Sequence, residues 1–293
     1  MSRQKRSKTK GVRGAKRGSL KTILLYGSFV VFSLIILLPF FWLIRSALVP
    51  QKYLFTTPPV YFTLDLTLKN FITLFEQVPF YEYTRNSLVL AVSASFLSVA
   101  ISFMAAYAFA RIRFPGSNAL LWILILSMAL PEIGTIVPLY RVLNTFNLLD
   151  TLQGLILVMS SAMVPFTVWV LVSFIQQVPY EIEEAAIVDG ANILQVFSRV
   201  LIPVTAPGLV TMLLINFVGA WNNMLFPLSF SVTPASKTLS VAITEVYAGY
   251  SPYGKPWELI MAVGAVMVIP VIVMVLFSQR ALVRGLTAGA VKG

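Results

Sequence analysis

Residues 179–203 read PYEIEEAAIVDGANILQVFSRVLIP, and this stretch is a polar island between two long apolar runs. Pro179 suits the first turn of a helix, where its missing N–H is not needed, and the acidic residues after it lie at the positive end of the helix dipole. Gly190 predicts the end of that helix, because glycine adopts the left-handed conformation without a Cβ penalty. Asn192 and Gln195 have the spacing of a capping box. We therefore expect a helix, a sharp glycine turn and a second short helix, together lying across one face of a membrane.

The composition of the chain is that of a membrane protein. Of its 293 residues, 58% are hydrophobic and only 11% are charged, whereas a soluble domain carries about 25% charged residues. Apolar runs of about 20 residues recur, and each is long enough to cross a bilayer core of about 30 Å. The chain contains no Cys and no His, which excludes disulfides, Cys or His metal sites and His-based acid–base chemistry. The sequence predicts an all-α integral membrane protein.

Six apolar segments predict six transmembrane helices. The third is interrupted by Pro131, Glu132 and Gly134. The expected spans are 23–44, 86–110, 119–139, 152–174, 201–225 and 257–277. They divide the chain into a basic tail at 1–20, a six-span transmembrane domain at 21–277 that contains the polar island, and a short tail at 278–293.

The basic residues predict the orientation of these spans. Nine of the 22 Lys and Arg residues lie within the first 21 positions. With the amino terminus inside the cell, 15 basic residues fall on the inner side and seven on the outer side, as the positive-inside rule requires. Both termini and the polar island are then cytoplasmic. A basic tail can also bind nucleic acid or anionic lipid. Because this tail leads directly into a span, topology explains it more simply, and we expect contact with membrane lipid but none with nucleic acid.

The polar island resembles the EAA loop of ABC importer permeases. The resemblance rests on Glu184-Ala185-Ala186, on Gly190 four residues later, and on the aliphatic residues that precede Pro203. Val200 and Ile202 depart conservatively from the family's Ile and Leu, and Phe197 fits the longer form found in sugar importers. Segments 106–116 and 279–293 are similar to permeases of maltose and trehalose importers, among them the smaller maltose permease subunit.

The resemblance implies a transport subunit rather than an enzyme. Its implied partners are a second, homologous permease, a dimer of ATP-binding cassette ATPases and an extracytoplasmic sugar-binding protein in a bacterial or archaeal cell membrane. No cofactor and no metal is expected on this chain, since Gly249–Pro256 only imitates a phosphate-binding loop and Pro256 replaces its Ser or Thr. The coupling helices are implied at about 179–200. The residues implied in ATPase coupling are Glu183, Glu184, Ala185, Ala186, Asp189, Gly190, Phe197 and Pro203. The residues implied in contacts of the carboxyl-terminal tail are Gly285, Thr287, Gly289 and Lys292.

Several polar residues within the spans are candidates for a sugar pathway. Glu132 is the one ionisable residue well inside a span, where a carboxylate costs roughly 2.5–3.5 kcal/mol to insert. It either has a functional role or lies in a structural position at the exterior mouth. The other candidates are Asn216, Trp221, Asn222 and Asn223, which could bind sugar hydroxyls or hydrogen-bond between helices. Ser95, Ser98 and Ser102 share one helix face, and for them we favour close packing over a polar lining.

These observations lead to one preferred function and two alternatives. The preferred hypothesis is a permease subunit of an ATP-driven importer for a disaccharide or a maltose- or trehalose-like oligosaccharide. An ion-coupled secondary transporter would need intramembrane ionisable groups and inverted repeats, and only Glu132 qualifies. A membrane scaffold without transport activity is the third hypothesis. On the preferred hypothesis, Gly190→Val should uncouple ATP hydrolysis from transport.

Overall fold

The computed structural model describes residues 11–58, 60–249 and 254–290, with side chains from 21 to 279 within those ranges. Every regular element in these ranges is a helix. A short 3₁₀ turn lies at Gln51–Tyr53 and a π-helix at Val196–Leu201. The α-helices are α1 (Gly11–Leu48), α2 (Lys69–Gln77), α3 (Phe80–Arg111), α4 (Ser117–Ser127), α5 (Glu132–Thr145), α6 (Leu152–Gln176), α7 (Tyr180–Val188), α8 (Ile193–Gln195), α9 (Ile202–Asn222), α10 (Leu225–Phe230), α11 (Leu239–Ala248) and α12 (Trp257–Ala290).

The long helices confirm an all-α protein that crosses the membrane several times. In the described part of the chain, five helical segments are long and apolar enough to span a bilayer, and α4 with α5 makes a sixth if the bent pair is counted as one span. The five segments are Lys21–Leu48, Phe80–Arg111, Leu152–Gln176, Ile193–Asn222 and Trp257–Gln279.

The third predicted span is broken more sharply than its sequence suggests. Helices α4 and α5 meet at an angle of 102°. Pro131 lies between them with an extended backbone (φ −66°, ψ 132°). A proline has no N–H to continue the helical ladder, and it disfavours the helical conformation in the residue before it. The sequence predicted an interruption at Pro131 but not its size, and the broken pair runs from Ser117 to Thr145 rather than over 119–139.

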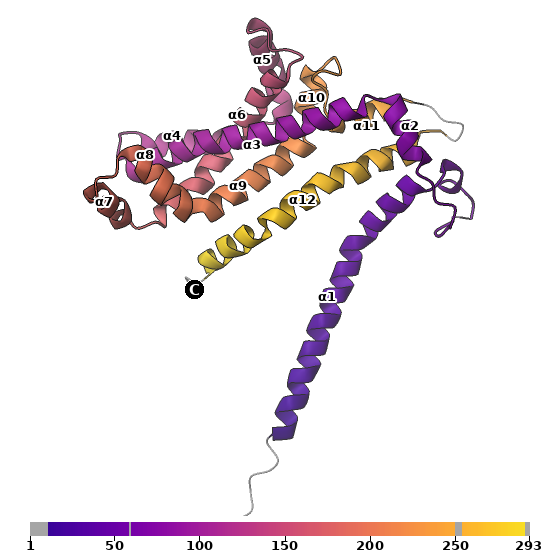
Figure 1. Ribbon diagram of the computed structural model, residues 1–293, viewed down its shortest axis with the longest axis horizontal. Coiled ribbons are helices and arrows are strands. Elements are labelled where there is room, and N and C mark those ends of the chain that lie inside the picture. The colour runs from indigo at the N-terminus through magenta and orange to yellow at the C-terminus, as the bar shows by residue number, and fades with distance from the viewer. Residues whose placement is uncertain (1–10, 59, 250–253, 291–293) are drawn as a thin grey trace, which may run out of the picture.

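Helices α3, α6 and α9 pack together at the centre of the bundle, and α12 runs alongside α9 (Figure 1). Ser95, Ser98 and Ser102 of α3 are all buried. The Ser102 hydroxyl donates to the Val164 carbonyl of α6 at 3.4 Å. Small side chains on this face let neighbouring helices approach closely, so the packing interpretation of the three serines is confirmed.

Helix α1 leaves this bundle. Its carboxyl-terminal end lies beside α2 and α12, and the rest of the helix extends away from the other helices (Figure 1). None of the most apolar stretch of its spanning segment is buried, and Leu38, for example, is 66% exposed. The apolar surface of α1 therefore lacks a cover among the described residues.

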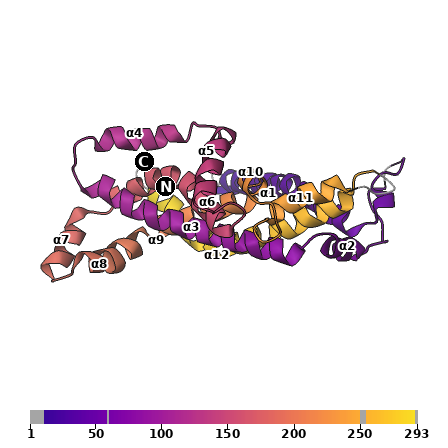
Figure 2. The ribbon, with the colours of Figure 1, turned by 90° about the horizontal axis from the view of Figure 1, so that it is seen from above.

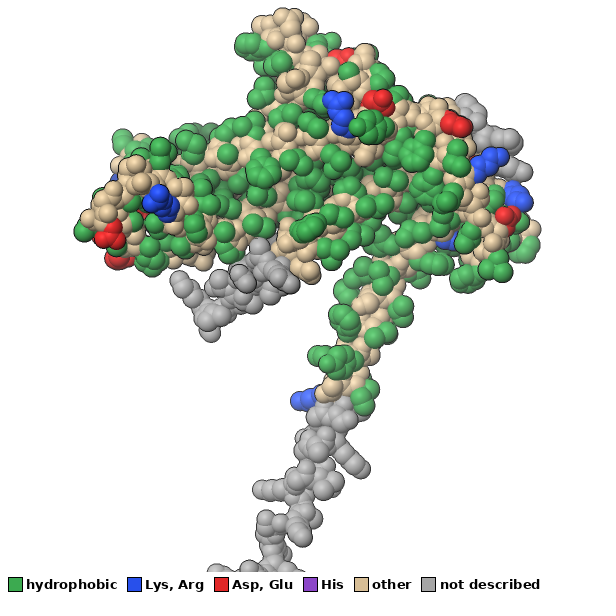
Figure 3. All heavy atoms as spheres, viewed as in Figure 1, with side chains coloured by type: hydrophobic (Ala, Val, Ile, Leu, Met, Phe, Trp, Pro, Cys, Tyr) green, Lys and Arg blue, Asp and Glu red, His purple; other side chains and the backbone are tan. Residues whose placement is uncertain are grey.

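The bundle has two distinct ends. Helices α7 and α8 lie at one end and α2 lies at the other (Figures 1 and 2). On the face in Figure 3, charged side chains gather toward these ends and around α5 and α10, while apolar side chains cover the stretch between. This arrangement is what a bilayer requires, because charges are costly in its apolar core.

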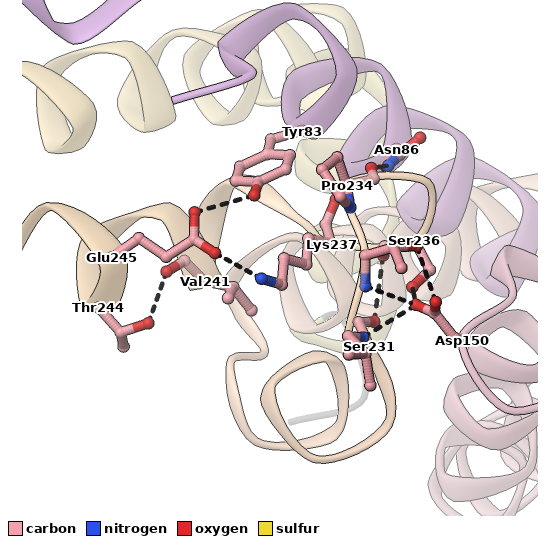
Figure 4. A network of polar contacts seen from close by, with 12 residues as sticks. Tyr83, Asn86, Asp150, Ser231, Pro234, Ser236, Lys237, Val241, Thr244 and Glu245 are labelled. Carbon is pink, nitrogen blue, oxygen red and sulfur yellow. Dashed lines mark hydrogen bonds and ion pairs between the residues drawn. The ribbon is translucent and has the colours of Figure 1, made fainter. Parts of the chain in front are cut away.

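The connection between α10 and α11 is held by the start of α3 (Figure 4). The Asn86 side-chain amide donates to the carbonyls of Pro234 and Lys237, each at 2.9 Å. The Tyr83 hydroxyl donates to Glu245 Oε2 at 2.8 Å, and Lys237 Nζ lies 2.6 Å from Glu245 Oε1. Helix α3 is therefore fixed to this connection at one end of the bundle and reaches α7 at the other.

Candidate functional site

The helix and glycine turn predicted after Pro179 are present. Helix α7 starts directly after Pro179, which has an extended backbone (φ −57°, ψ 134°). Gly190 has a φ of +88°, in the left-handed region that favours glycine. The Ala191 N–H donates to the Ala186 carbonyl at 2.9 Å, which closes the turn. The chain thus reverses at the one residue type that allows this backbone without strain.

The predicted capping box is confirmed, but the helix that it starts is longer than expected. The Gln195 N–H donates to Asn192 Oδ1 at 3.0 Å, and the Asn192 N–H donates to Gln195 Oε1 at 2.9 Å. Helix α8 then continues through the π-helix into α9. The fifth predicted span, expected from Leu201, consequently starts at Ile193 in the structure. The π-helix ends just before Pro203. Because Pro203 has no N–H, it interrupts the regular α-helical hydrogen bonds, and the π-helix falls where this interruption occurs.

Residues 179–201, called the elbow below, present a mixed surface of acidic and apolar side chains. Glu184, Ala185, Asp189 and Gly190 are exposed, and Ala186 is half-buried. Val188 is 86% exposed and Leu194 is 76% exposed. Exposed apolar side chains rimmed by polar ones are typical of a surface that binds another protein.

Glu183 differs from its neighbour Glu184, because its side chain points inward. It is 1% exposed, and its Oε1 accepts hydrogen bonds from the Arg111 guanidinium at 2.7 Å. Sequence reasoning placed Arg111 in segment 106–116 but did not find this partner. The two residues are 72 positions apart, so no local pattern connects them.

Phe197 also packs inward, against the end of α3. Its ring centroid lies 4.5 Å from that of Tyr107 and 5.7 Å from that of Phe103. Pro203 occupies the first turn of α9 and is exposed. Of the predicted coupling residues, Glu183 and Phe197 therefore attach the elbow to the bundle, and the others lie on or near its outer surface.

Glu132 and Asn223 are brought together at a groove, although they are 91 residues apart. The Asn223 amide donates to Glu132 Oε2 at 3.4 Å, and both side chains remain accessible. The groove has a volume of about 720 Å³ and lies between the α4–α5 bend, α6 and α10. Among the residues that line it are Met128, Pro131, Glu132, Ser161, Pro165 and Phe226. A carboxylate beside an apolar wall can accept hydrogen bonds from hydroxyls while the wall contacts carbon atoms.

The other pathway candidates lie elsewhere. Asn216 is 3% exposed and donates to the hydroxyls of Thr167 at 2.9 Å and Ser98 at 3.2 Å. Trp221 is 1% exposed and its indole N–H donates to the Met267 carbonyl at 3.0 Å. These two residues connect helices inside the bundle. Asn222 is exposed and donates to a carbonyl of its own helix.

The carboxyl-terminal tail continues the last spanning helix. Helix α12 extends to Ala290, so Gly285, Thr287 and Gly289 have a helical backbone. Lys292 lies outside the described residues. The tail starts as an extension of α12 rather than as a separate segment.

Comparisons with known proteins agree with this geometry. Residues 98–288 match the family described as binding-protein-dependent transport system inner membrane component. The chain is 36% identical over 257 residues to the trehalose transport system permease protein SugB of Mycobacterium tuberculosis, over 88% of this chain and 93% of SugB. It is 33% identical to the diacetylchitobiose uptake system permease protein DasC of Streptomyces coelicolor, over 90% and 95% of the two chains. It is 31% identical to the trehalose/maltose transport system permease protein MalG of Thermococcus litoralis, over 94% and 98%.

Solved structures agree on the fold. A chain of a bacterial ABC transporter that imports the acidic polysaccharide alginate matches 95% of this chain and 100% of its own length, with a TM-score of 0.74 and 18% identity. A chain of the MetNI methionine ABC transporter in an inward-facing conformation matches 69% and 93% of the two chains, with a TM-score of 0.54 and 18% identity.

Proposed function

The chain belongs to the family of binding-protein-dependent transport system inner membrane components, and from that premise we propose that it is one of two permease subunits of an ATP-driven carbohydrate importer. The observation that carries this proposal is the elbow. It projects from one end of the bundle, with its exposed carboxylates and apolar side chains uncovered among the described residues. It also carries the sequence that resembles the EAA loop.

The elbow is the part of the chain that meets the ATPase. Glu184 and Asp189 offer negative charge to basic side chains, and Val188 and Leu194 offer apolar area to a cleft. Because α7 is short and anchored at both ends, movement of a docked ATPase subunit carries it as a unit. We also propose that the tail residues Gly285, Thr287, Gly289 and Lys292 contact the same partner. This chain binds no nucleotide of its own, and ATP hydrolysis belongs to the ATPase dimer.

The orientation follows from charge. The elbow, the basic amino-terminal tail and the carboxyl-terminal tail lie in the cytoplasm of a bacterium or archaeon, because 15 of the 22 basic residues then lie inside. The α2 end and the α10–α11 connection face the exterior, where a sugar-binding protein delivers its ligand. The uncovered apolar surface of α1 packs against the second permease or against lipid.

The transported molecule is a small carbohydrate. Several relatives carry the name of the molecule that they transport, and these molecules are glycosides such as trehalose and diacetylchitobiose. The groove beside Glu132 is the part of the path that this chain contributes. Its carboxylate and the Asn223 amide receive sugar hydroxyls, and Phe226 and Pro131 contact the apolar faces of sugar rings. Asn216 and Trp221 are structural.

Uptake into proteoliposomes tests the proposal. The chain is purified together with its co-expressed second permease, its ATPase and its binding protein, and it is supplied with radiolabelled trehalose or maltose. We expect accumulation that requires both ATP inside the vesicle and binding protein outside. Uptake driven by a proton or sodium gradient without ATP would instead support an ion-coupled transporter, which the family does not favour. Failure of the chain to co-purify with any ATPase would support a scaffold.

A further inference from the structure

Arg111 forms a buried connection between the last residue of α3 and the first turns of α7. Its Nε and one terminal nitrogen each lie 2.7 Å from Glu183 Oε1. The same terminal nitrogen donates to the Val178 carbonyl at 2.8 Å, and the guanidinium lies over the Tyr180 ring, 5.6 Å from its centroid. The Arg111 side chain thus contacts Val178 before α7, and within α7 both the first residue, Tyr180, and the buried Glu183.

Because this ion pair is buried, losing either partner is costly for the stability of the protein. The side chains of Arg111 and Glu183 are 10% and 1% exposed. A carboxylate this far from water needs an opposite charge in good geometry, and removal of either partner leaves an uncompensated charge. The planar guanidinium can contact the carboxylate and a carbonyl at the same time, which a lysine ammonium does less well.

A second contact attaches the other half of the elbow to the same helix face. Phe197 packs against Tyr107 and Phe103. Phe103, Tyr107 and Arg111 are spaced four residues apart, so they lie on one face of α3. The two halves of the elbow, on either side of Gly190, are therefore both seated on α3.

We propose that Arg111 is a positioning residue for energy coupling, which makes α3 the spanning helix that moves with α7. The inference rests on the proposed role of the elbow as the ATPase contact. Helices α6 and α9 adjoin the elbow in sequence, but the buried ion pair runs to α3. Because the far end of α3 contacts the α10–α11 connection through Asn86 and α11 itself through Tyr83, a displacement of α7 reaches the opposite end of the bundle along one helix.

The test measures the number of sugars transported per ATP in the reconstituted complex. Arg111→Gln should lower this ratio by about fivefold or more, as expected for a coupling free energy of ordinary size, while the ATPase subunits stay bound. The charge-swapped double variant Arg111→Glu with Glu183→Arg should recover part of the ratio, a rescue that loss of packing alone would not produce. An unchanged ratio in Arg111→Gln would overturn the proposal.

If Arg111→Gln does not fold, a second variant that leaves no unpaired buried charge tests the same proposal. The double variant Arg111→Met with Glu183→Met removes both charges, and such apolar replacement of a buried pair is often tolerated. It should melt close to the unchanged protein and still transport fewer sugars per ATP. Full coupling in this folded variant would also overturn the role of Arg111.

A third set of variants separates this inference from the proposed function. Gly190→Val places a β-branched residue at a φ of +88°, whereas Gly190→Asn tolerates that backbone. If Gly190→Val and Glu184→Ala keep full ATPase binding and uptake, the elbow is not the ATPase contact and the proposed function fails. If those two variants lose coupling while the Arg111 variants retain it, only the role of Arg111 fails.

Discussion

At the scale of single residues, polar side chains with similar sequence signals have different roles. Asn216 and Asn223 are seven positions apart, which is close to two helical turns, so they lie on nearly the same side of the helix axis. Asn216 is 3% exposed and bonded between helices, whereas Asn223 directly follows α9 and contacts Glu132, which lines the groove. The position of an asparagine along the helix axis, rather than the side of the helix on which it lies, therefore decides whether it packs between helices or stays accessible.

The groove gives a prediction at this scale. Glu132→Gln keeps the size of the side chain but removes the charged acceptor, and a hydrogen bond to a charged group contributes roughly 1.5–3 kcal/mol. We expect the KM for sugar uptake to rise about tenfold, with little change in ATPase binding. Asp65→Asn is the matched control, because Asp65 lies at the α2 end beside Lys52. Equal KM values in the two variants would remove Glu132 from the path.

At the scale of elements, Asp150 joins the α5–α6 corner to the segment after α10 (Figure 4). Its Oδ1 accepts from the N–H groups of Val232 and Thr233 at 2.9 and 3.0 Å and from the Ser236 hydroxyl at 2.5 Å. Partial burial would raise the pKa of Asp150, but the hydrogen bonds from Ser236, Thr233 and Val232 outweigh it and lower the pKa to about 2. The broken α4–α5 pair is held to the bundle by this contact.

This contact predicts a dependence of stability on pH. Because the folded pKa of Asp150 lies below its usual value, the carboxylate stabilises the fold at neutral pH, and its contribution is lost as the pH falls through about 4 toward 2. Melting temperatures in detergent should fall over that range in the unchanged protein. At pH 7 the Asp150→Asn variant should lose about 1–3 kcal/mol of unfolding free energy and melt at a lower temperature. Its melting temperature should also depend less on pH. An Asp150→Asn variant with the unaltered acid transition would show that other carboxylates cause it.

At the scale of the whole molecule, the orientation in the membrane is open to a direct test because the chain has no native cysteine. Leu64 at the α2 end is fully exposed and Leu194 in the elbow is 76% exposed. A membrane-impermeant maleimide should label the Leu64→Cys variant in intact cells and the Leu194→Cys variant only after permeabilisation. Labelling of Leu194→Cys from outside would invert the orientation and remove the elbow from any cytoplasmic partner.

The sequence by itself determined the membrane class, the approximate spans and the helix–glycine–capping-box pattern of the elbow. These features depend on apolar run length and on residues within a few positions of one another, as with Gly190 and the Asn192–Gln195 pair. The tertiary structure alone decided that Glu183 faces Arg111 while Glu184 faces outward, that Glu132 meets Asn223, and that the third span bends by 102°. The two pairings join residues 72 and 91 positions apart, and the size of the bend depends on how α5 packs. Local pattern carries no information about which distant surfaces meet, because burial and pairing are set only when the helices come together.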